Sequence, residues 1–392
     1  EMSKYTKIID NSNTPQDQIL IGRETEMKKN NAGGFVFELT PLKAAERFLI
    51  LGSEGGTYYT GERTLTGANA AGIIKLAREG NVELVTLIHT IATAMPARAP
   101  KMEPALFALG ICTAVGTPEV KARALAVLPE VARIPTHLFS FLDAHKALGG
   151  KTGGRSFQRA LQNWYLGNEK LAYHLVKYQG RGGWTNKDVL KLARPTPVTD
   201  DQKTAFAWSV KGLVPEGASQ DQRYLAAAHE LLRGSVSKAR AVQLISDFRF
   251  THEMVPTELQ KDGDVWAALL NHMPVGAMIR NLGRMTSIGL VSPLSDAAKH
   301  IQTTLGNQEV LNRARIHPMN AYVALRTYTA GKGNRGNLVW YPVQSISDAL
   351  ESAFYLCFGN IEPSGKNIML ALDISGSMGT FYQCYGSKAM NG

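Results

Sequence analysis

Cysteine is scarce in this sequence, and long apolar runs are absent. The chain of 392 residues has 3 cysteines, none near another, so it contains neither C-x-x-C zinc spacing nor a disulfide framework. This scarcity favours a reducing compartment, and we expect the protein to be cytoplasmic. No run reaches the roughly 18 apolar residues that a membrane-spanning helix needs. The polar N-terminus has no apolar core of the kind that a secretory signal contains.

The common signatures of catalysis are also absent. Gly150-Lys151-Thr152 resembles the end of a phosphate-binding loop, but position 145 holds His where that loop requires Gly. The 9 histidines show no metal-binding spacing, and no Gly-x-Ser-x-Gly elbow occurs. The sequence therefore predicts that the protein is not an enzyme.

The composition is that of a globular protein with a basic surface. It is 44% hydrophobic, 8% aromatic and 19% charged, which excludes intrinsic disorder for most of the chain. The formal net charge is +10. This balance favours an anionic partner, with nucleic acid ahead of a membrane surface.

From Pro41 onward the sequence has helical periodicity. Apolar residues recur at spacings of three and four, and Gly, Pro or Asn ends each run. A short strand is expected before them, at 35–37. Helix pairs of about 40 residues favour a HEAT-like solenoid over an irregular all-α globule. The predicted helices span 42–51, 67–78, 82–94, 104–115, 118–128, 135–148, 154–166, 168–179, 185–193, 201–212, 221–233, 237–247, 264–272, 274–285, 293–304, 318–330 and 343–358.

Near the C-terminus the pattern changes to that of an α/β domain. Residues 367–374 (NIMLALDI) form an apolar run with one acid near its end, as in a buried parallel strand. Such a strand would carry Asp373 to the edge of a sheet where open α/β folds bind ligands. Because residues 375–392 alone follow it, we expect the second domain to be truncated in this chain.

Asp373, Ser375 and Ser377 form a D-x-S-x-S motif directly after this predicted strand. Their hard oxygens could bind one divalent cation, and Mg²⁺ suits such ligands. The alternative is a turn in which Asp373 caps the following helix. Further oxygen ligands would have to come from later loops, so cation binding is doubtful in the truncated chain.

The basic charge is concentrated between residues 145 and 194. This window has ten basic and two acidic side chains, a net charge of +8. Three pairs of basic residues spaced four apart predict basic helix faces. The window also contains Trp164, Tyr165, Tyr178 and Trp184, which could stack on unpaired bases but fit a helical core better. The pairs are Arg155 with Arg159, Lys177 with Arg181, and Lys187 with Lys191.

Several segments together resemble the Ro ribonucleoprotein family, whose characteristic unit is the TROVE module. The similarity extends in order over roughly residues 14–380 and includes RALQNWY and KYQGRGGW in the basic window. The segments that carry it are 30–34, 47–59, 154–184, 274–294, 314–327 and 348–378.

The resemblance implies a fold and a function. It implies a ring of HEAT-like helical pairs closed by a von Willebrand A domain. We expect an extended segment at 1–33, the TROVE helical domain at 34–360, and the first strand and metal-site loop of a truncated von Willebrand A domain at 361–392. Family members bind Y RNA on the outside of the ring and single-stranded ends of misfolded or 3′-extended noncoding RNA in its hole. They act in RNA quality control as chaperones, and a Y RNA can tether an exoribonuclease. We expect a monomer.

The resemblance also assigns roles to residues. Lys177, Arg181 and Arg194 match the outer RNA contacts, and Arg194 stands where relatives often have His. Arg280 and Arg284 are candidates for the hole, with an ion pair inside the solenoid as the alternative. Asp373, Ser375 and Ser377 match the metal-ion-dependent adhesion site. The full set of predicted RNA-binding residues also contains Lys170, Arg155, Arg159, Lys187 and Lys191.

Two other functions stay open. The protein could be a protein-interaction scaffold in which the solenoid or the adhesion site binds an acidic partner. It could also process RNA, but the sequence contains no carboxylate or histidine constellation that would activate water.

Overall fold

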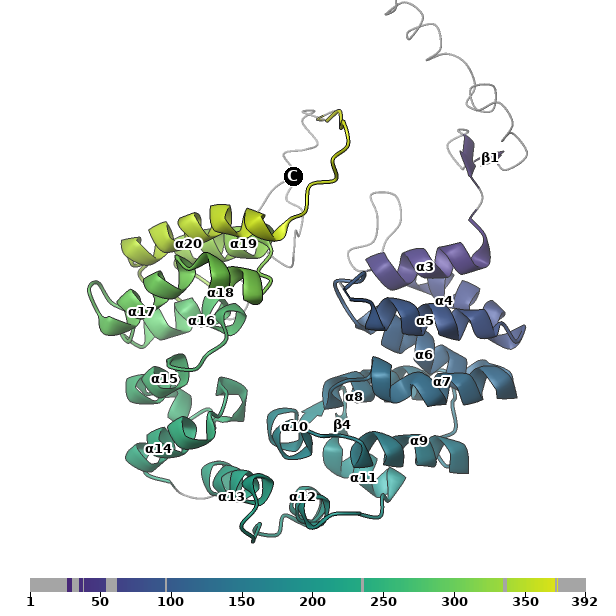
Figure 1. Cartoon of the computed structure of the whole chain (residues 1–392), viewed down its shortest axis with the longest axis horizontal. Coiled ribbons are helices and arrows are strands. Elements are labelled where there is room, and N and C mark those ends of the chain that lie inside the picture. Colours follow the sequence, from purple (N-terminus) through teal and green to yellow (C-terminus); the bar gives the residue numbers. More distant parts are fainter. Residues whose placement is uncertain are drawn as a thin grey trace, which may run out of the picture. The chain divides into compact units, whose positions relative to one another are not determined.

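The computed structural model is mainly helical and describes residues 27–29, 35–37, 39–53, 62–95, 97–233, 236–333, 337–370 and 372 (Figure 1). The chain divides into two compact units. The N-terminal unit consists of Glu1–Glu169 and Tyr178–Thr196. The C-terminal unit consists of Lys170–Lys177 and Pro197–Gly392.

The N-terminal unit contains most of the basic window. Several of its helices begin at a side-chain cap, as with Thr117 Oγ1, which accepts a hydrogen bond from the backbone N–H of Val120. Its elements are β1 (Met27–Lys29), β2 (Phe35–Phe37), α3 (Pro41–Leu51), α4 (Glu62–Arg78), α5 (Val82–Thr93), α6 (Glu103–Val115), α7 (Pro118–Val131), α8 (Pro135–Ala147), α9 (Arg155–Leu166), β3 (Gly180–Arg181), β4 (Trp184–Thr185) and α11 (Asn186–Ala193).

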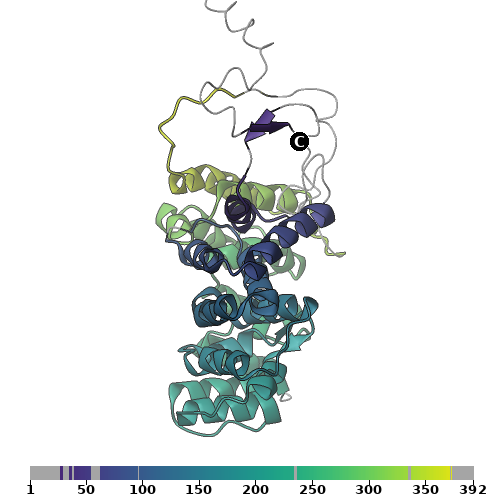
Figure 2. The same cartoon turned by 90° about the vertical axis from the view of Figure 1, so that its right-hand side faces the viewer.

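These helices form two layers in which every second helix is a neighbour. In one layer α5 contacts α3 and α7, and α9 contacts α7 and α11; in the other α6 contacts α4 and α8 (Figure 2). Leu84, Leu109, Leu128 and Leu138 are fully buried between the layers. The repeated contact between helical hairpins is the packing expected of a solenoid.

The C-terminal unit is also built of packed helices. Its elements are α10 (Leu171–Lys177), α12 (Asp200–Lys211), α13 (Gln220–Arg233), α14 (Lys238–Phe248), η2 (His252–Met254), η3 (Leu259–Lys261), α15 (Gly263–Leu270), α16 (Val275–Ser287), α17 (Asp296–Leu305), α18 (Gln308–Arg313), α19 (Pro318–Thr329), α20 (Gln344–Leu356) and η4 (Cys357–Asn360).

Helix α16 lies at the centre of this unit's later half. It contacts α15, α17 and α19, and α20 covers α17 and α19. Its apolar side is buried through Met278, Leu282 and Met285. The opposite side carries Arg280, so the helix presents charge where it is not covered.

The predicted helices and the strand at 35–37 are confirmed, most of them with ends shifted by a few residues. The strand pairs antiparallel with Met27–Lys29. Helix α18, which has only six residues, and the short 3₁₀ turns were not predicted. The β3–β4 hairpin was not predicted either.

The helix predicted at 168–179 is wrong at its C-terminal end. Helix α10 stops at Lys177, and Arg181 lies on β3, paired with Trp184. Between these strands Gly182 and Gly183 both have positive φ, at 59° and 81°. Two such residues make the tight hairpin turn that two neighbouring glycines favour. Lys177 and Arg181 therefore do not share a helix face.

The buried strand predicted at 367–374 is also wrong in its described part. Residues 367–370 and 372 have no strand structure. Ile368, Met369, Leu370 and Leu372 are each at least 69% exposed. A strand is stabilised by pairing with a neighbour, and no segment of the described residues pairs with this one.

Among the described helices, none is both long enough and apolar enough to cross a bilayer. The ring closure and the von Willebrand A domain implied by the resemblance stay predictions.

Candidate nucleic-acid interface

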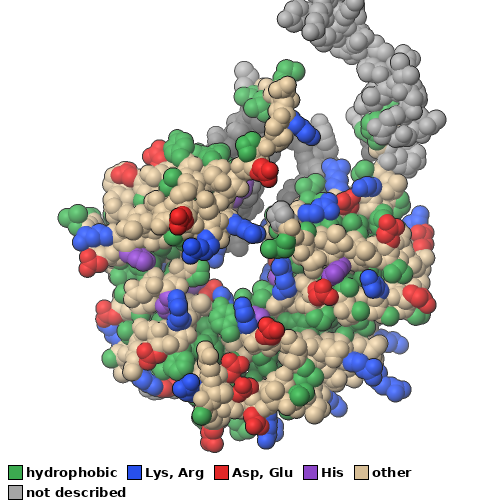
Figure 3. All heavy atoms as spheres, in the orientation of Figure 1, with side chains coloured by type: hydrophobic (Ala, Val, Ile, Leu, Met, Phe, Trp, Pro, Cys, Tyr) green, Lys and Arg blue, Asp and Glu red, His purple; other side chains and the backbone are tan. Residues whose placement is uncertain are grey.

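Two adjoining helices of the N-terminal unit carry exposed basic residues. Helices α9 and α11 pack against each other, and the Nε2 of Gln162 on α9 donates a hydrogen bond of 2.7 Å to the carbonyl oxygen of Ala193. Figure 3 shows Lys and Arg side chains gathered on the surface over α9. We use the term basic face for the exposed residues Arg155, Arg159, Lys187, Lys191 and Arg194 of these helices.

Helix α9 is strongly amphipathic, which places its arginines outside. Phe157, Leu161 and Trp164 are buried on one side, whereas Arg155 and Arg159 are exposed on the other. The spacing of four puts the two guanidinium groups one above the other along the helix. Both were predicted to share a face, and the helix bounds confirm it.

The polar groups around α11 fix its position. A capping box joins Thr185 and Asp188, whose carboxylate accepts hydrogen bonds from the backbone N–H of Thr185 at 3.0 Å and its hydroxyl at 2.6 Å. Behind the helix, the Tyr165 hydroxyl donates to Asn186 Oδ1, and Asn186 Nδ2 donates to the Tyr178 carbonyl oxygen. Asp188 is one of the two acids in the basic window, and its Oδ2 is engaged in this cap.

The aromatic residues of the window divide between core and surface. Trp164 and Tyr165 are 4% and 0% exposed, so they belong to the core and cannot stack on a base. Trp184 is half-buried, and Lys146 Nζ lies 5.6 Å from its ring centroid. The interpretation of these four residues as core is therefore confirmed for Trp164 and Tyr165.

Arg181 lies apart from the basic face, on the exposed β3 hairpin. Its guanidinium is 3.5 Å from the carboxylate of Glu103, which reduces the charge that it offers to a ligand. Burial and then Arg133 lower the pKa of nearby His137 to about 4, with a smaller contribution from Arg181. Lys170 is exposed and precedes α10.

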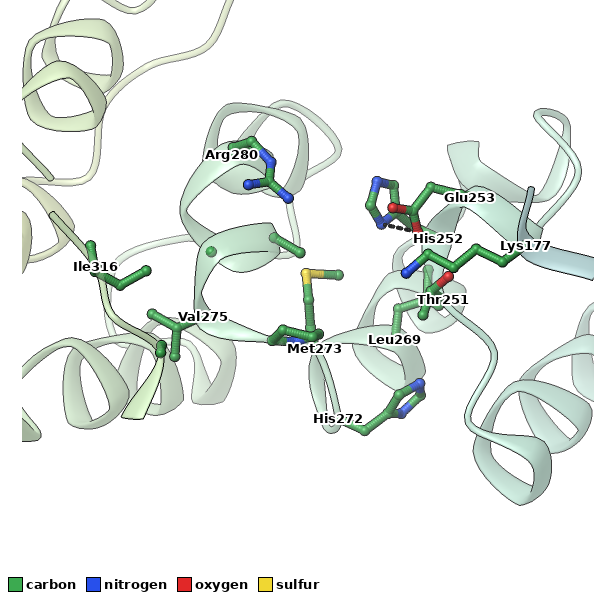
Figure 4. Close-up of a pocket in the computed structure, with 14 residues that line it drawn as sticks. Lys177, Thr251, His252, Glu253, Leu269, His272, Met273, Val275, Arg280 and Ile316 are labelled. Atoms are coloured by element: carbon green, nitrogen blue, oxygen red, sulfur yellow. Dashed lines mark ion pairs between the residues drawn. The ribbon is translucent and has the colours of Figure 1, made fainter. Parts of the chain in front are cut away.

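In the C-terminal unit, Lys177 lines a cavity of about 320 Å³ together with Arg280 (Figure 4). The Lys177 ammonium group donates a hydrogen bond of 3.0 Å to the Tyr173 hydroxyl. His252 and Glu253 lie on the same side of the cavity as Lys177, and Arg280 projects from α16 opposite them. The structure thus brings together two residues that the resemblance assigned to different RNA sites.

The titratable groups of this cavity influence one another. The His252 Nδ1 is 3.1 Å from the Glu253 carboxylate. Burial lowers the pKa of His252, and the charges of Arg280 and Lys177 lower it further against the opposing effect of Glu253. At neutral pH the ring is therefore neutral, and the fixed positive charges of the cavity are Lys177 and Arg280.

A second cavity of about 720 Å³ adjoins the first along α16. Arg280 lines both cavities, and Arg284 lines the second. Arg284 Nη2 donates a hydrogen bond of 3.2 Å to the carbonyl oxygen of Gln260. Within the part of the chain that the structure describes, neither arginine forms an ion pair, so the ion-pair alternative is not supported.

The sequence did not single out the other residues that line these cavities. His252, Glu253, His272 and Trp340 come from segments far apart in the chain and form no local motif. Only contacts among η2, α15, α16 and the segment after α19 bring them together. A sequence pattern could have found the arginines but not their surroundings.

The predicted metal residues Asp373, Ser375 and Ser377 lie outside the described residues. No group of three or more His, Cys, Asp or Glu side chains suited to a metal occurs in the described ranges. The cation site stays a prediction.

The chain is similar to known proteins over most of its length. The TROVE domain profile matches residues 28–227 and 246–327. The "RNA-binding protein RO60" of Caenorhabditis elegans is 34% identical, over 89% of this chain and 66% of that protein. The protein of the same name from Deinococcus radiodurans is 35% identical, over 96% of this chain and 70% of that protein.

A solved structure has the same fold. The crystal structure of the Deinococcus radiodurans RO (RSR) protein matches with a TM-score of 0.77 and 32% sequence identity. The match covers 87% of this chain and 68% of that one. The chain thus spans about two thirds of the length of the proteins that it resembles.

Proposed function

This chain belongs to the TROVE domain family, and we propose that it binds small structured noncoding RNAs of the Y RNA type and misfolded noncoding RNAs. In this proposal it acts in RNA quality control as a chaperone and scaffold. The names of its relatives support RNA as the ligand. The observation that carries the proposal for this chain is the basic face, the set of exposed cations on two adjoining helices of one unit.

The basic face suits a folded RNA. Its Lys and Arg side chains are exposed and can contact phosphates without a rearrangement of the core. No buried aromatic of the window has to move, so recognition would depend on charge and backbone shape rather than on base sequence. A stem-loop offers phosphates on a fixed helical path, which the rigidly capped α11 can match.

Arg280 and Arg284 in the C-terminal unit suit the unpaired part of an RNA. Neither is used in an ion pair among the described residues, and both line cavities. A misfolded or 3′-extended RNA has a single-stranded end that can enter a narrow site closed to a duplex. We assign the structured part of the ligand to the basic face and the unpaired part to these arginines.

The remaining parts of the proposal follow from the resemblance. The role is binding without catalysis, in the cytoplasm, as a monomer. An exoribonuclease would be tethered through the bound RNA rather than through the protein. Mg²⁺ at Asp373, Ser375 and Ser377 belongs to the same proposal, and no step of RNA binding depends on it.

The test is the salt dependence of binding to a stem-loop RNA. For six to ten phosphate contacts, affinity should fall by about 10³–10⁵ between 50 and 200 mM salt. The double variant Lys187→Ala/Lys191→Ala removes two contacts and should lower the slope of log K against log salt by about 2. Fluorescence anisotropy with labelled RNA measures both quantities.

The matched control is Arg78→Ala/Arg123→Ala, which removes two exposed cations of the same unit outside the basic window. It should leave the slope almost unchanged. If the wild type binds the stem-loop no better than a polyanion of equal length, the RNA proposal fails, and the protein-interaction scaffold becomes the better explanation.

A further inference from the structure

A carboxylate from outside the basic window lies against one of the window's arginines. Arg181 Nη2 is 3.5 Å from Glu103 Oε1, and the two side chains are 51% and 46% exposed. Glu103 begins α6, whereas Arg181 lies on β3, far along the chain. Helix α8 brings the two together, because it packs against both α6 and the β3–β4 hairpin. The carboxylate therefore occupies the Arg181 guanidinium within the N-terminal unit.

The hairpin that carries Arg181 does not depend on this ion pair for its position. Its two strands pair with each other, and both contact α8. On α8, Lys146 Nζ lies 5.6 Å from the centroid of the Trp184 ring, which adds a cation–π contact between helix and hairpin. The Glu103–Arg181 pair can therefore open while the hairpin stays in place.

The geometry of the Glu103–Arg181 pair makes it weak. Its length of 3.5 Å exceeds the roughly 2.7–2.9 Å of a charge-assisted hydrogen bond between a guanidinium and a carboxylate. Both side chains are about half exposed, so water and salt screen their attraction. A phosphate that approached closely would bind the Arg181 guanidinium more strongly than Glu103 does. An RNA phosphate is thus able to replace the carboxylate.

Glu103 remains in a favourable position after the pair opens. It is the first residue of α6, and the N-cap residue Met102 makes no side-chain hydrogen bond to the helix. The partial positive charge at the N-terminus of a helix stabilises an acidic side chain there. Because the carboxylate is half exposed, opening the pair leaves no buried charge without a partner.

The surroundings of the pair have an excess of positive charge. Burial and then Arg133 lower the pKa of His137 to about 4. Glu103 opposes this effect and Arg181 adds to it, so all three charges act on the same ring. The ring itself is neutral at pH 7. Two arginines therefore outnumber one carboxylate here, which favours the approach of an anion.

We propose that Glu103 is an internal competitor of RNA, which holds Arg181 in the free protein and is displaced by a phosphate when a structured RNA binds. The proposal rests on the RNA-binding function proposed above and describes how the chain itself regulates that binding. The hairpin leads directly into α11, whose N-cap is Thr185, so a phosphate on Arg181 would add one contact beside the basic face. The pair lowers the affinity for any anion that does not reach Arg181.

The test is to remove the carboxylate. Glu103→Gln keeps the size of the side chain and frees Arg181, so the affinity for a labelled stem-loop RNA should rise roughly two- to fivefold, the value of one exposed ion pair. Glu103→Ala should give the same rise. Arg181→Ala should weaken binding roughly 3- to 10-fold, because it removes a charge-assisted contact together with the pair that opposes it. Anisotropy titrations measure the affinities, and circular dichroism checks that each variant is folded.

The double variant Glu103→Gln/Arg181→Ala separates a local contact from an effect of net charge. If Glu103 acts through Arg181, removal of the carboxylate adds little once the guanidinium is absent, and the double variant should bind like Arg181→Ala. The matched control is Glu119→Gln, which removes an exposed acid from the first turn of α7. It changes the net charge equally and should leave the affinity almost unchanged, because at about 150 mM salt charges more than roughly 8 Å apart are screened.

Three results would overturn the proposal. They are a Glu103→Gln variant that binds the stem-loop no more tightly than the wild type, an equal rise with and without Arg181, and an affinity that Arg181→Ala leaves unchanged. The proposal alone fails if one of these occurs while Lys187→Ala/Lys191→Ala still weakens binding of the stem-loop. Both it and the proposed function fail if the wild type binds the stem-loop no better than a polyanion of equal length.

Discussion

Arg194 occupies a backbone conformation that usually belongs to glycine. It follows α11 as its C-cap with φ 51° and ψ 53°, in the left-handed region. Its Nε donates a weak hydrogen bond of 3.4 Å to the Lys191 carbonyl oxygen. A residue with a Cβ is strained there by about 1–2 kcal/mol. The conformation directs the Arg194 guanidinium to the end of the basic face. Glycine would adopt the conformation without strain but has no charged group.

Replacement of Arg194 by Gly should change stability and RNA binding in opposite directions. Arg194→Gly relieves the strain and should raise the free energy of unfolding by up to about 1 kcal/mol, because the greater freedom of glycine in the unfolded chain offsets part of the gain. The same change should weaken stem-loop binding and lower the salt slope by about 1. Urea denaturation and anisotropy titration measure the two effects. A loss of stability together with unchanged binding would contradict this assignment.

Two histidines make stability dependent on pH. Burial, followed by neighbouring positive charges, lowers the pKa of both His137 and His174 from 6.5 to about 4. Because each folded-state pKa lies below the unfolded value, the unfolded chain takes up protons first as the pH falls. Stability is therefore fully present above pH 6.5 and is lost between about pH 6.5 and 4.

Urea denaturation at pH 7 and pH 5 tests this dependence. The free energy of unfolding should be lower at pH 5 by about 1–3 kcal/mol, after allowance for partial solvent exposure of the rings. His137→Asn and His174→Asn should each reduce the difference, whereas replacement of the exposed His300 should not. A wild-type protein equally stable at both values would be inconsistent with two neutral rings whose pKa is lowered in the folded protein.

At the scale of elements, local sequence signals predicted most of the fold. Thr117-Pro118 marked the start of α7, and the spacing of apolar residues marked the helices that pack in two layers. The errors have physical causes. The helix predicted through 179 ends at Lys177 because Gly182 and Gly183 favour a hairpin turn shortly after it.

The other features of the elements that differ from prediction could not have been found from local sequence rules. The apolar run at 367–374 looks like a strand, but a strand depends on a partner elsewhere in the chain. The two cavities beside α16 depend on contacts between distant segments, so Trp340 and His272 carried no signal of their own. The basic face was predictable because helix periodicity alone puts Arg155 beside Arg159 and Lys187 beside Lys191.

The cap of α11 links an element's stability to binding. Thr185→Ala removes the hydroxyl of the capping box and should cost about 1 kcal/mol of stability. Fraying of the first turn should also weaken stem-loop binding a few fold, because Lys187 lies in that turn. Thr199→Ala is the matched control, since Thr199 caps α12 of the other unit by accepting from the Gln202 N–H. Thr199→Ala should lower the free energy of unfolding by a similar amount without weakening stem-loop binding. If both variants weakened stem-loop binding equally, the effect would come from general destabilisation rather than from the cap of α11.

At the scale of the whole molecule, the two units carry different kinds of binding surface. The N-terminal unit has the open basic face on α9 and α11, which suits phosphates on a folded RNA. In the C-terminal unit, Arg280 and Arg284 line two cavities beside α16 and are the proposed site for the unpaired part of an RNA. An RNA with a stem and a single-stranded tail would use both, whereas a fully paired RNA would use one.

The most direct test uses one such RNA, a stem-loop with a ten-nucleotide single-stranded tail. Its affinity is measured for the wild type, for Lys187→Ala/Lys191→Ala, for Gly276→Leu and for the combined variant. Gly276 lines both cavities beside α16, so a leucine there would fill their junction. Our account predicts that the losses in binding free energy caused by the two sets of changes add in the combined variant. It also predicts that only the lysine changes lower the slope of log K against log salt, by about 2. If Gly276→Leu has no effect on the tailed RNA, or if removal of the tail leaves its effect unchanged, the division of the ligand between the two units is contradicted.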